Sequence, residues 1–204
     1  MQITNLRCEY KGNPIGIDVS RPRLSWQIAA DGRGTIQSAY QIQVAESDAA
    51  LSSGDPRWDS GQVASDASVH RPYEGPPLRS GQRCAWRVRA WDGDDQPSAW
   101  SEPVFWEMGL LSPSDWQASW IQPDIEEDVS TSQPCPMLRA TFRVDGAVRS
   151  ARAYVTALGL YELMLNGVRV GEDVLTPGWT AYDERLQYQT YDVTDLLVEG
   201  ENAV

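Results

Sequence analysis

Basic and histidine side chains are scarce in this 204-residue chain. One Lys, sixteen Arg and one His stand against 29 acidic residues, and the formal net charge is −12. Proteins that bind nucleic acid or anionic membranes use basic patches, so this balance argues against both kinds of partner. Because His70 is the single histidine, and Gly-x-Ser-x-Gly and His-Glu-x-x-His are both missing, the sequence argues against a serine triad and a zinc hydrolase site. We interpret His70 as an ordinary polar loop residue.

Cysteine and long apolar runs are also scarce. Cys8, Cys84 and Cys135 lie far apart without a Cys-x-x-Cys pair. This spacing favours free buried thiols in a reducing compartment over a disulfide framework or a zinc site. No apolar run approaches the roughly 20 residues of a membrane helix. The N-terminus has neither the basic n-region nor the apolar h-region of a signal peptide, so we expect a cytoplasmic protein without a membrane partner.

Carboxylates gather at residues 124–128, just before a run of Ser and Thr. Such a cluster could hold calcium, but the alternating Asp-x-Asp-x-Asp-Gly pattern of a calcium loop is missing. We interpret this stretch as a solvated loop, and we predict neither a metal site nor a cofactor.

Short stretches of alternating apolar and polar residues, separated by turn-forming residues, dominate the first half of the chain. The alternating stretches are residues 23–28, 39–45, 84–91 and 104–108. On the third of these, Cys84, Trp86, Val88 and Ala90 share one face. Several short strands at such spacing favour a β-sandwich. The sequence therefore predicts an all-β fold, with a first sandwich at residues 1–108, a linker at 109–133 and a second β domain at 134–204.

The strongest local signal in the second half is a hairpin centred on Asn166-Gly167. A two-residue type I′ turn needs positive φ at both central positions, which Asn and Gly tolerate. The turn places Leu165 opposite Val168 and Leu163 opposite Val170, so we expect these four side chains to share one apolar face.

Further strands are predicted at residues 138–144, 151–157 and 186–193. Thr194 follows the last of them and could cap a single helical turn. A turn at residues 200–202 then leads toward a strand that we expect to begin at Ala203. Trp116 and Trp120 lie four residues apart, which fits either one helix face or an irregular packed segment.

Several motifs of the first half resemble a fibronectin type III module. They are Leu24-Ser25-Trp26, Trp86-Arg87-Val88-Arg89-Ala90 and Ser98-Ala99-Trp100-Ser101-Glu102. Such modules usually carry a corner tyrosine where this chain has Cys84. The resemblance therefore implies a fibronectin-III or immunoglobulin-like β-sandwich without the usual corner hydrogen bond.

An ordered set of motifs resembles the N-terminal region of bacterial α-L-rhamnosidases, glycoside hydrolase family 78. The set comprises Asn13-Pro14-Ile15-Gly16, Trp116-Gln117-Ala118-Ser119-Trp120, Leu165-Asn166-Gly167, Thr176-Pro177-Gly178-Trp179 and Tyr188-Gln189-Thr190-Tyr191-Asp192-Val193-Thr194. The resemblance implies a jelly roll after the first sandwich, and an enzyme that cleaves terminal α-L-rhamnose from glycosides. The family's catalytic carboxylates lie in a later (α/α)6 barrel without a counterpart here. We therefore assign no catalytic residue and expect this chain alone to be inactive.

The second domain is expected to be a partial jelly roll, because a two-sheet jelly roll needs eight strands and residues 134–204 supply fewer. A sandwich that lacks strands exposes unpaired backbone groups, so self-association through an exposed edge could follow.

Residues 176–185 form the best candidate for a carbohydrate-binding loop. A sugar needs an apolar face and planar polar partners, and Trp179, Tyr182, Asp183 and Arg185 are residues of those types. Alternatively, Trp179 and Tyr182 fill the sandwich core while Arg185 pairs with an acid. A free-standing carbohydrate-binding protein and a purely structural or interaction module are the competing functions.

Overall fold

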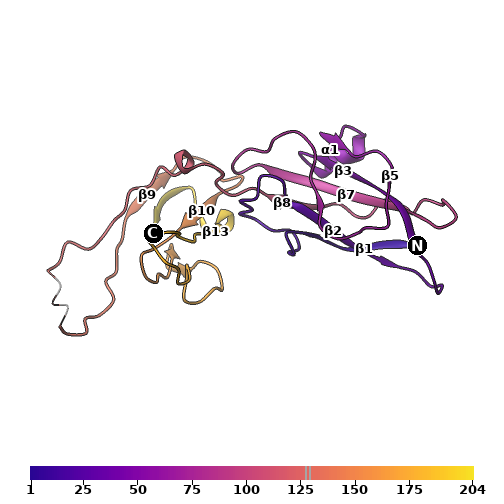
Figure 1. Cartoon of the computed structure of the whole chain (residues 1–204). Coiled ribbons are helices and arrows are strands. Elements are labelled where there is room, and N and C mark those ends of the chain that lie inside the picture. Colours follow the sequence, from indigo (N-terminus) through magenta and orange to yellow (C-terminus); the bar gives the residue numbers. More distant parts are fainter. Residues whose placement is uncertain (127, 129) are drawn as a thin grey trace. The chain divides into compact units, whose positions relative to one another are not determined.

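A computed structural model describes residues 1–126, 128 and 130–204, and it divides into two compact units. Unit 1 is Met1–Trp116 and unit 2 is Gln117–Val204. Both units consist mainly of strands and loops (Figure 1), so the predicted all-β class is confirmed. The domain limits predicted at residues 108 and 133 remain predictions.

Unit 1 contains two antiparallel sheets, as an immunoglobulin-like sandwich requires. The three-stranded sheet has the order β1-β2-β6, with β1 at Gln2–Cys8, β2 at Arg23–Ala29 and β6 at Arg71–Pro72. The five-stranded sheet has the order β4-β3-β7-β8, and β5 also pairs with β3. Its strands are β3 (Gln37–Ala45), β4 (Trp58–Asp59), β5 (Val63–Ala64), β7 (Arg83–Asp92) and β8 (Val104–Glu107).

Alternate residues of the long strands form the core between the sheets. Trp26 of β2 and Trp86 of β7 belong to one cluster of buried side chains. The predicted inward face of β7 is confirmed, but Ala85 on its other face is also buried. Ala85 is covered because it packs with Leu51 of a short helix.

That helix, α1 (Asp48–Ser53), was not predicted, although its capping residues are visible in the sequence. The Ser47 hydroxyl accepts a hydrogen bond from the Ala50 amide at 3.2 Å. Gly54 ends the helix in the left-handed conformation, with φ of 76°. A Ser before the first turn and a Gly after the last one are typical of the two ends of a helix.

The loop between β6 and β7 contains a tyrosine hydrogen bond although residue 84 is a buried cysteine. The Tyr73 hydroxyl donates to the Pro76 carbonyl at 3.0 Å, so Tyr73 anchors this loop. A Cβ atom at Gly75 would collide with the Tyr73 ring. Residue 84 cannot supply a tyrosine hydrogen bond, and Tyr73 holds this loop instead.

Arginine and tryptophan side chains stack on the outward face of β7. The guanidinium carbons of Arg87 and Arg89 each lie 4.7 Å from the Trp100 ring centroid. Arg89 also lies 4.9 Å from the Trp91 centroid. These cation–π contacts cover part of the aromatic surface of this sheet with guanidinium groups.

The described residues of unit 2 form three two-stranded antiparallel sheets, consistent with part of a jelly roll (Figure 1). The pairs are β9 (Thr141–Val144) with β14 (Gly200–Ala203), β10 (Arg152–Val155) with β13 (Gln189–Asp192), and β11 (Met164–Leu165) with β12 (Val168–Arg169). The predicted strands are present but shorter than expected. The preceding segment includes Glu127 of the acidic stretch and the following Val129, both of which lie outside the described residues.

Two predictions near the C-terminus are wrong. The last strand begins at Gly200, because residues 200–203 already pair with β9. Thr194 does not cap the helical turn, since it is the first residue of η2 (Thr194–Leu196). Its hydroxyl instead donates to Asp192 Oδ1 at 2.6 Å and accepts from the Ala151 amide at 3.0 Å.

The predicted hairpin and its register are confirmed. Asn166 has φ of 51° and Gly167 has φ of 80°, and Leu165 pairs with Val168. Leu165 and Val170 are buried, whereas Val168 is 51% exposed. The four-residue apolar face was therefore only partly right, because Val168 lies outside the small buried cluster of unit 2.

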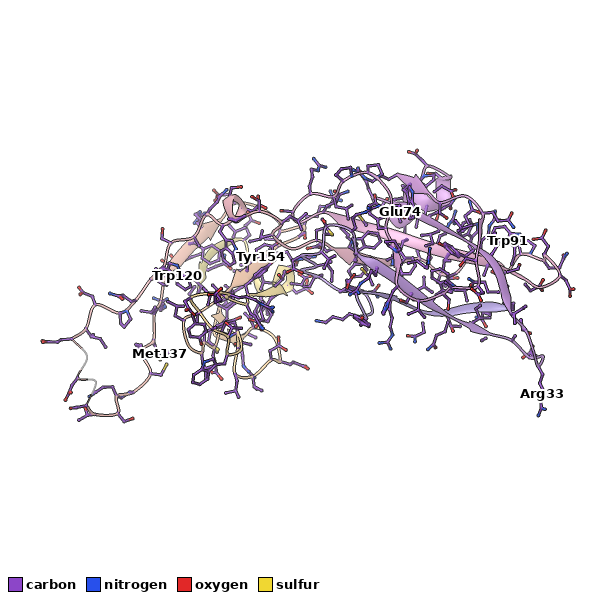
Figure 2. All side chains as sticks on the ribbon, viewed as in Figure 1. Arg33, Glu74, Trp91, Trp120, Met137 and Tyr154 are labelled. Carbon is purple, nitrogen blue, oxygen red and sulfur yellow. The ribbon has the colours of Figure 1, made fainter. Side chains whose placement is uncertain are left out.

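Trp116 ends η1 (Pro113–Asp115), and residues 117–123 form no regular element. The segment is therefore irregular, as one alternative predicted, and the two side chains share no helix face; the expected packing is wrong for Trp120, which is 62% exposed. Figure 2 shows the side chains of Trp120 and Met137 on the stretch that precedes β9. The described residues contain no helix long and apolar enough to cross a membrane.

All three cysteines are free, but their environments differ. Cys8 and Cys84 are buried in the core of unit 1, and burial raises the pKa of both thiols, that of Cys84 to about 12. Cys135 is exposed, which corrects the expectation that all three thiols would be buried.

Candidate functional site

The candidate loop at residues 176–185 is held at its start by an isolated antiparallel bridge between Tyr161 and Thr176. The Tyr161 amide donates to the Thr176 carbonyl at 3.0 Å, and the Thr176 hydroxyl donates to the Tyr161 carbonyl at 2.9 Å. The Thr176–Pro177 peptide bond is cis. The loop therefore leaves a fixed point on unit 2.

Gln189 of β13 forms the base of the loop. Its amide nitrogen donates to the Pro177 carbonyl at 3.2 Å, while its amide oxygen accepts from the Tyr161 hydroxyl at 3.2 Å. The Tyr161 and Tyr191 hydroxyls lie 3.1 Å apart, and burial raises the pKa of Tyr161. The hydroxyls and the amide therefore form one neutral network beneath the loop.

The four predicted site residues lie on the outer part of this loop. Trp179 is 90% exposed, so it does not fill the core. Tyr182 is partly buried, and Asp183 and Arg185 are exposed. The amides of Glu184 and Arg185 both donate to the Ala181 carbonyl, at 2.9 and 2.8 Å, which forms one tight turn.

No ion pair within the described ranges joins Arg185 to an acid, so the alternative role of Arg185 is not observed. Tyr182, Asp183 and Arg185 follow one another closely in sequence on this turn, and Trp179 precedes it. An exposed indole on the same loop as an exposed carboxylate and an exposed guanidinium can offer a stacking surface and charged hydrogen-bond partners to a sugar.

Exposed aliphatic side chains surround the start of the loop. Leu158 and Leu160 precede the bridge residue Tyr161, and Val174 and Leu175 precede Thr176. All four are exposed. Exposed apolar clusters of this kind also occur where proteins dock onto one another. The exposed aliphatic residues next to the bridge between Tyr161 and Thr176 therefore fit a protein interface.

No metal-ligand group was found among the residues that the structure describes. None of their His, Cys, Asp and Glu side chains gather in groups of three or more that could hold an ion. Asp128 binds its own neighbour, because its Oδ1 accepts from the Ser130 amide at 2.9 Å and from the Ser130 hydroxyl at 2.6 Å. These hydrogen bonds lower the pKa of Asp128. The absence of a calcium site remains a prediction.

His70 lies in a group of side chains that the sequence did not reveal. Its ring contacts the Tyr10 ring, with 4.8 Å between centroids. Arg23 and Glu9 pair beside them, with 2.6 Å between Arg23 Nη2 and Glu9 Oε2. About 60 residues separate His70 from Tyr10, and no sequence motif joins them, so only the fold reveals this group.

Each of the two units contains a segment that matches a known protein family. The family "Rha78A-like, N-terminal immunoglobulin domain" matches residues 3–112, which is most of unit 1. The chain belongs to this α-L-rhamnosidase family. A second family, "Alpha-L-rhamnosidase N-terminal domain", matches residues 146–204 within unit 2. The resemblance to the N-terminal region of α-L-rhamnosidases is therefore confirmed for both halves of the chain, whereas the resemblance to a fibronectin type III module stays a prediction.

Individual α-L-rhamnosidases match nearly the whole chain. One from Formosa agariphila is 41% identical over 198 residues, which are 94% of this chain and 21% of the relative. One from Streptomyces avermitilis is 28% identical, and the match covers 100% of this chain and 36% of the relative. The chain thus spans between about a fifth and a third of these relatives.

Solved α-L-rhamnosidase structures share the fold. The structure from Dictyoglumus thermophilum has a TM-score of 0.91 at 34% identity, with 100% of this chain and 24% of that chain covered. The structure from Aspergillus terreus has a TM-score of 0.78 at 36% identity, with 99% and 23% covered. The chain corresponds to the N-terminal part of such enzymes.

Proposed function

We propose that this chain is the non-catalytic N-terminal β region of an enzyme that removes terminal α-L-rhamnose from glycosides. The supporting observation is that both units match N-terminal α-L-rhamnosidase families, while the chain spans only part of the relatives. The catalytic domain is then the partner of this region. A cytoplasmic location and independence from cofactors belong to the same proposal.

Within that role, residues 176–185 contribute to carbohydrate recognition. Trp179 is nearly fully exposed on a loop whose start is fixed by four hydrogen bonds involving Tyr161, Thr176 and Gln189. An exposed indole costs free energy in water unless a ligand covers it, and the apolar face of a sugar suits such a surface. Tyr182, Asp183 and Arg185 supply the polar partners.

The non-catalytic role is tested by assaying the purified chain on an aryl α-L-rhamnoside. Glycoside hydrolysis needs two carboxylates roughly 5–9.5 Å apart across the sugar, and we assign no such pair to this chain. We expect no turnover above the blank. Turnover that one carboxylate-to-amide substitution abolishes would overturn this part of the proposal.

Carbohydrate recognition is tested by calorimetric titration with L-rhamnose and with a rhamnose-terminated oligosaccharide. Trp179→Ala should abolish binding because it removes the stacking surface. Trp120→Ala is the matched control, since Trp120 is also an exposed tryptophan of unit 2, at 62%. Equal affinity of both variants would show that the loop does not bind the sugar.

A docking role for unit 2 is the second candidate, and the exposed aliphatic side chains beside the loop favour it. The residues are Leu158, Leu160, Val174 and Leu175. On this reading they contact a catalytic domain or a second copy of the chain. Analytical ultracentrifugation separates the two functions: self-association that Leu175→Ser weakens, together with no heat on sugar titration, would favour docking.

A further inference from the structure

A row of outward-facing side chains crosses the three-stranded sheet of unit 1. Arg7 of β1 pairs directly with Ser25 of β2, and the Ser25 hydroxyl accepts from the His70 amide at 3.0 Å. Directly paired residues share a sheet face, and so do residues two apart on one strand. Arg23 therefore faces outward with Ser25, while the intervening Leu24 is buried.

A strained turn projects Tyr10 beside this row. Cys8 and Lys11 exchange two backbone hydrogen bonds, at 2.9 and 3.0 Å, around Glu9 and Tyr10. Both central residues are left-handed, with φ of 47° and 71°. This conformation normally selects Asn and Gly, so Glu and Tyr adopt it at a cost in free energy. His70 is also left-handed, with φ of 54°.

The side chains of the row converge on Tyr10. The Tyr10 ring centroid lies 4.8 Å from that of His70 and 5.4 Å from the Arg23 guanidinium carbon. Arg7 Nη1 donates to the Tyr10 carbonyl at 2.9 Å. Tyr10 is nevertheless 58% exposed and the Arg23 side chain 43% exposed. Strained backbone is most often retained where it positions a functional group.

Positive charge exceeds negative charge at this point of an acidic chain. Glu9 pairs with Arg23 through Nε and Nη2, which neutralises one guanidinium. Arg7 donates only to neutral oxygens, those of Asn5 and Tyr10, and no carboxylate within the described part of the chain forms an ion pair with it. The His70 ring adds an imidazole N–H donor beside these groups.

We propose that Arg7, Tyr10, Arg23 and His70, named here the Tyr10 site, bind a small oxyanion such as a carboxylate or sulfate group. A guanidinium with neutral partners retains donors for such a group, and charge-assisted hydrogen bonds to oxyanions are short and strong. The oxyanion is either free or carried by a saccharide. The site is in unit 1, so it does not depend on the loop of Trp179.

The test is a titration of the full chain followed by NMR, with sodium sulfate, sodium glucuronate and neutral glucose as probes. We expect saturable shifts of the Tyr10 amide and the His70 ring with one or both anions, and no shift with glucose. Arg7→Gln should weaken binding roughly tenfold, the scale of one charge-assisted hydrogen bond. His70→Asn is a second variant, because Asn tolerates the left-handed conformation.

Arg33→Gln is the matched control, since Figure 2 shows Arg33 at the tip of the turn that follows β2, on an exposed segment. It should bind both anions as the unmodified chain does. Sulfate binding identifies a site for free anions, and glucuronate binding alone identifies a saccharide carboxylate. Absence of saturable shifts, or equal affinity in Arg7→Gln, His70→Asn and Arg33→Gln, would overturn the proposal.

Discussion

Asn166 uses all the polar atoms of its side chain to join the hairpin to η2 and to the last strand. Its amide nitrogen donates to the Leu196 carbonyl and to Asn202 Oδ1, both at 2.8 Å. Its amide oxygen accepts from the Ala203 amide at 2.8 Å. One residue therefore provides the left-handed turn and holds β14 against it, which explains why Asn suits this position better than Gly or Asp.

We expect Asn166→Asp to destabilise unit 2 by about 1–2 kcal/mol, because two donor hydrogen bonds are lost and a carboxylate then faces an amide oxygen. Asn13→Asp is the control: Asn13 is also left-handed, but its Oδ1 only accepts, from the Phe105 amide. Calorimetric unfolding of both variants checks this. Equal losses would show that the donors of Asn166 contribute nothing.

Glu9 links the stability of unit 1 to pH. The hydrogen bond from Arg23 lowers the pKa of the Glu9 carboxyl below its ordinary value. A carboxyl with a lowered folded-state pKa stabilises the fold above its unfolded pKa of about 4.3, and this stabilisation is lost as the pH falls through the folded value. Acidification below about pH 4 should therefore weaken the strained turn.

We expect Glu9→Gln to lower the melting temperature at pH 7 and to reduce its further fall between pH 5 and pH 3. Glu74→Gln is the control, because Glu74 is exposed and makes no hydrogen bond or ion pair among the described residues. Calorimetric melting temperatures at both ends of this range give the answer. Parallel curves for Glu9→Gln and the unmodified chain would contradict it.

At the scale of whole elements, alternation predicted the long strands well, because a residue pattern of period two directly reports a half-buried strand. The strands β2, β3 and β7 and the hairpin at Asn166 lie where expected. The two-residue strands β4, β5 and β6 were not predicted, since they exist only by pairing with strands that are distant in sequence. Local sequence carries no signal for such contacts.

The candidate site was predictable in its residue types but not in its environment. An aromatic residue such as Trp179 serves equally well in a core or on a surface, and only the fold shows that it is exposed. Tyr10 and His70 meet through the pairing of β1, β2 and β6. Long-range strand pairing of this kind cannot be read from spacing along the chain.

The strand β7 is central to unit 1, and Trp86 is its largest fully buried side chain. We expect Trp86→Ala to cost about 3–5 kcal/mol, the usual scale for removing a large buried aromatic residue. Trp86→Phe should cost less, since it keeps most of the apolar volume and removes an indole N–H without a partner among the described residues. Urea midpoints measure both, and similar values for the two variants would contradict the packing argument.

At the scale of the whole molecule, the two units differ in how much apolar surface they bury. The main cluster of unit 1 includes three fully buried tryptophans, whereas that of unit 2 consists of Leu165, Val170, Tyr191 and Val193. Buried apolar area is the dominant favourable term in folding. Unit 2 is therefore expected to be the less stable half unless a partner chain covers it.

Amide hydrogen exchange on the dilute chain tests this expectation. The amides of residues 161–170 should exchange faster than those of residues 86–91, because smaller cores open with lower free energies. Light scattering on the same sample establishes whether the chain is monomeric. Equal protection in a monomer would mean that unit 2 is stable by itself.

Because the three thiols differ in burial, the rate at which each is chemically modified can report how often unit 1 opens. A maleimide reacts with the thiolate, so Cys135 should be modified within minutes at neutral pH, while Cys8 and Cys84 remain unreactive. Modification of Cys8 and Cys84 requires unit 1 to open, so the rate of their modification measures the frequency of that opening. Mass spectrometry would count one adduct early and three late, and three adducts from the start would show that the core is already permeable.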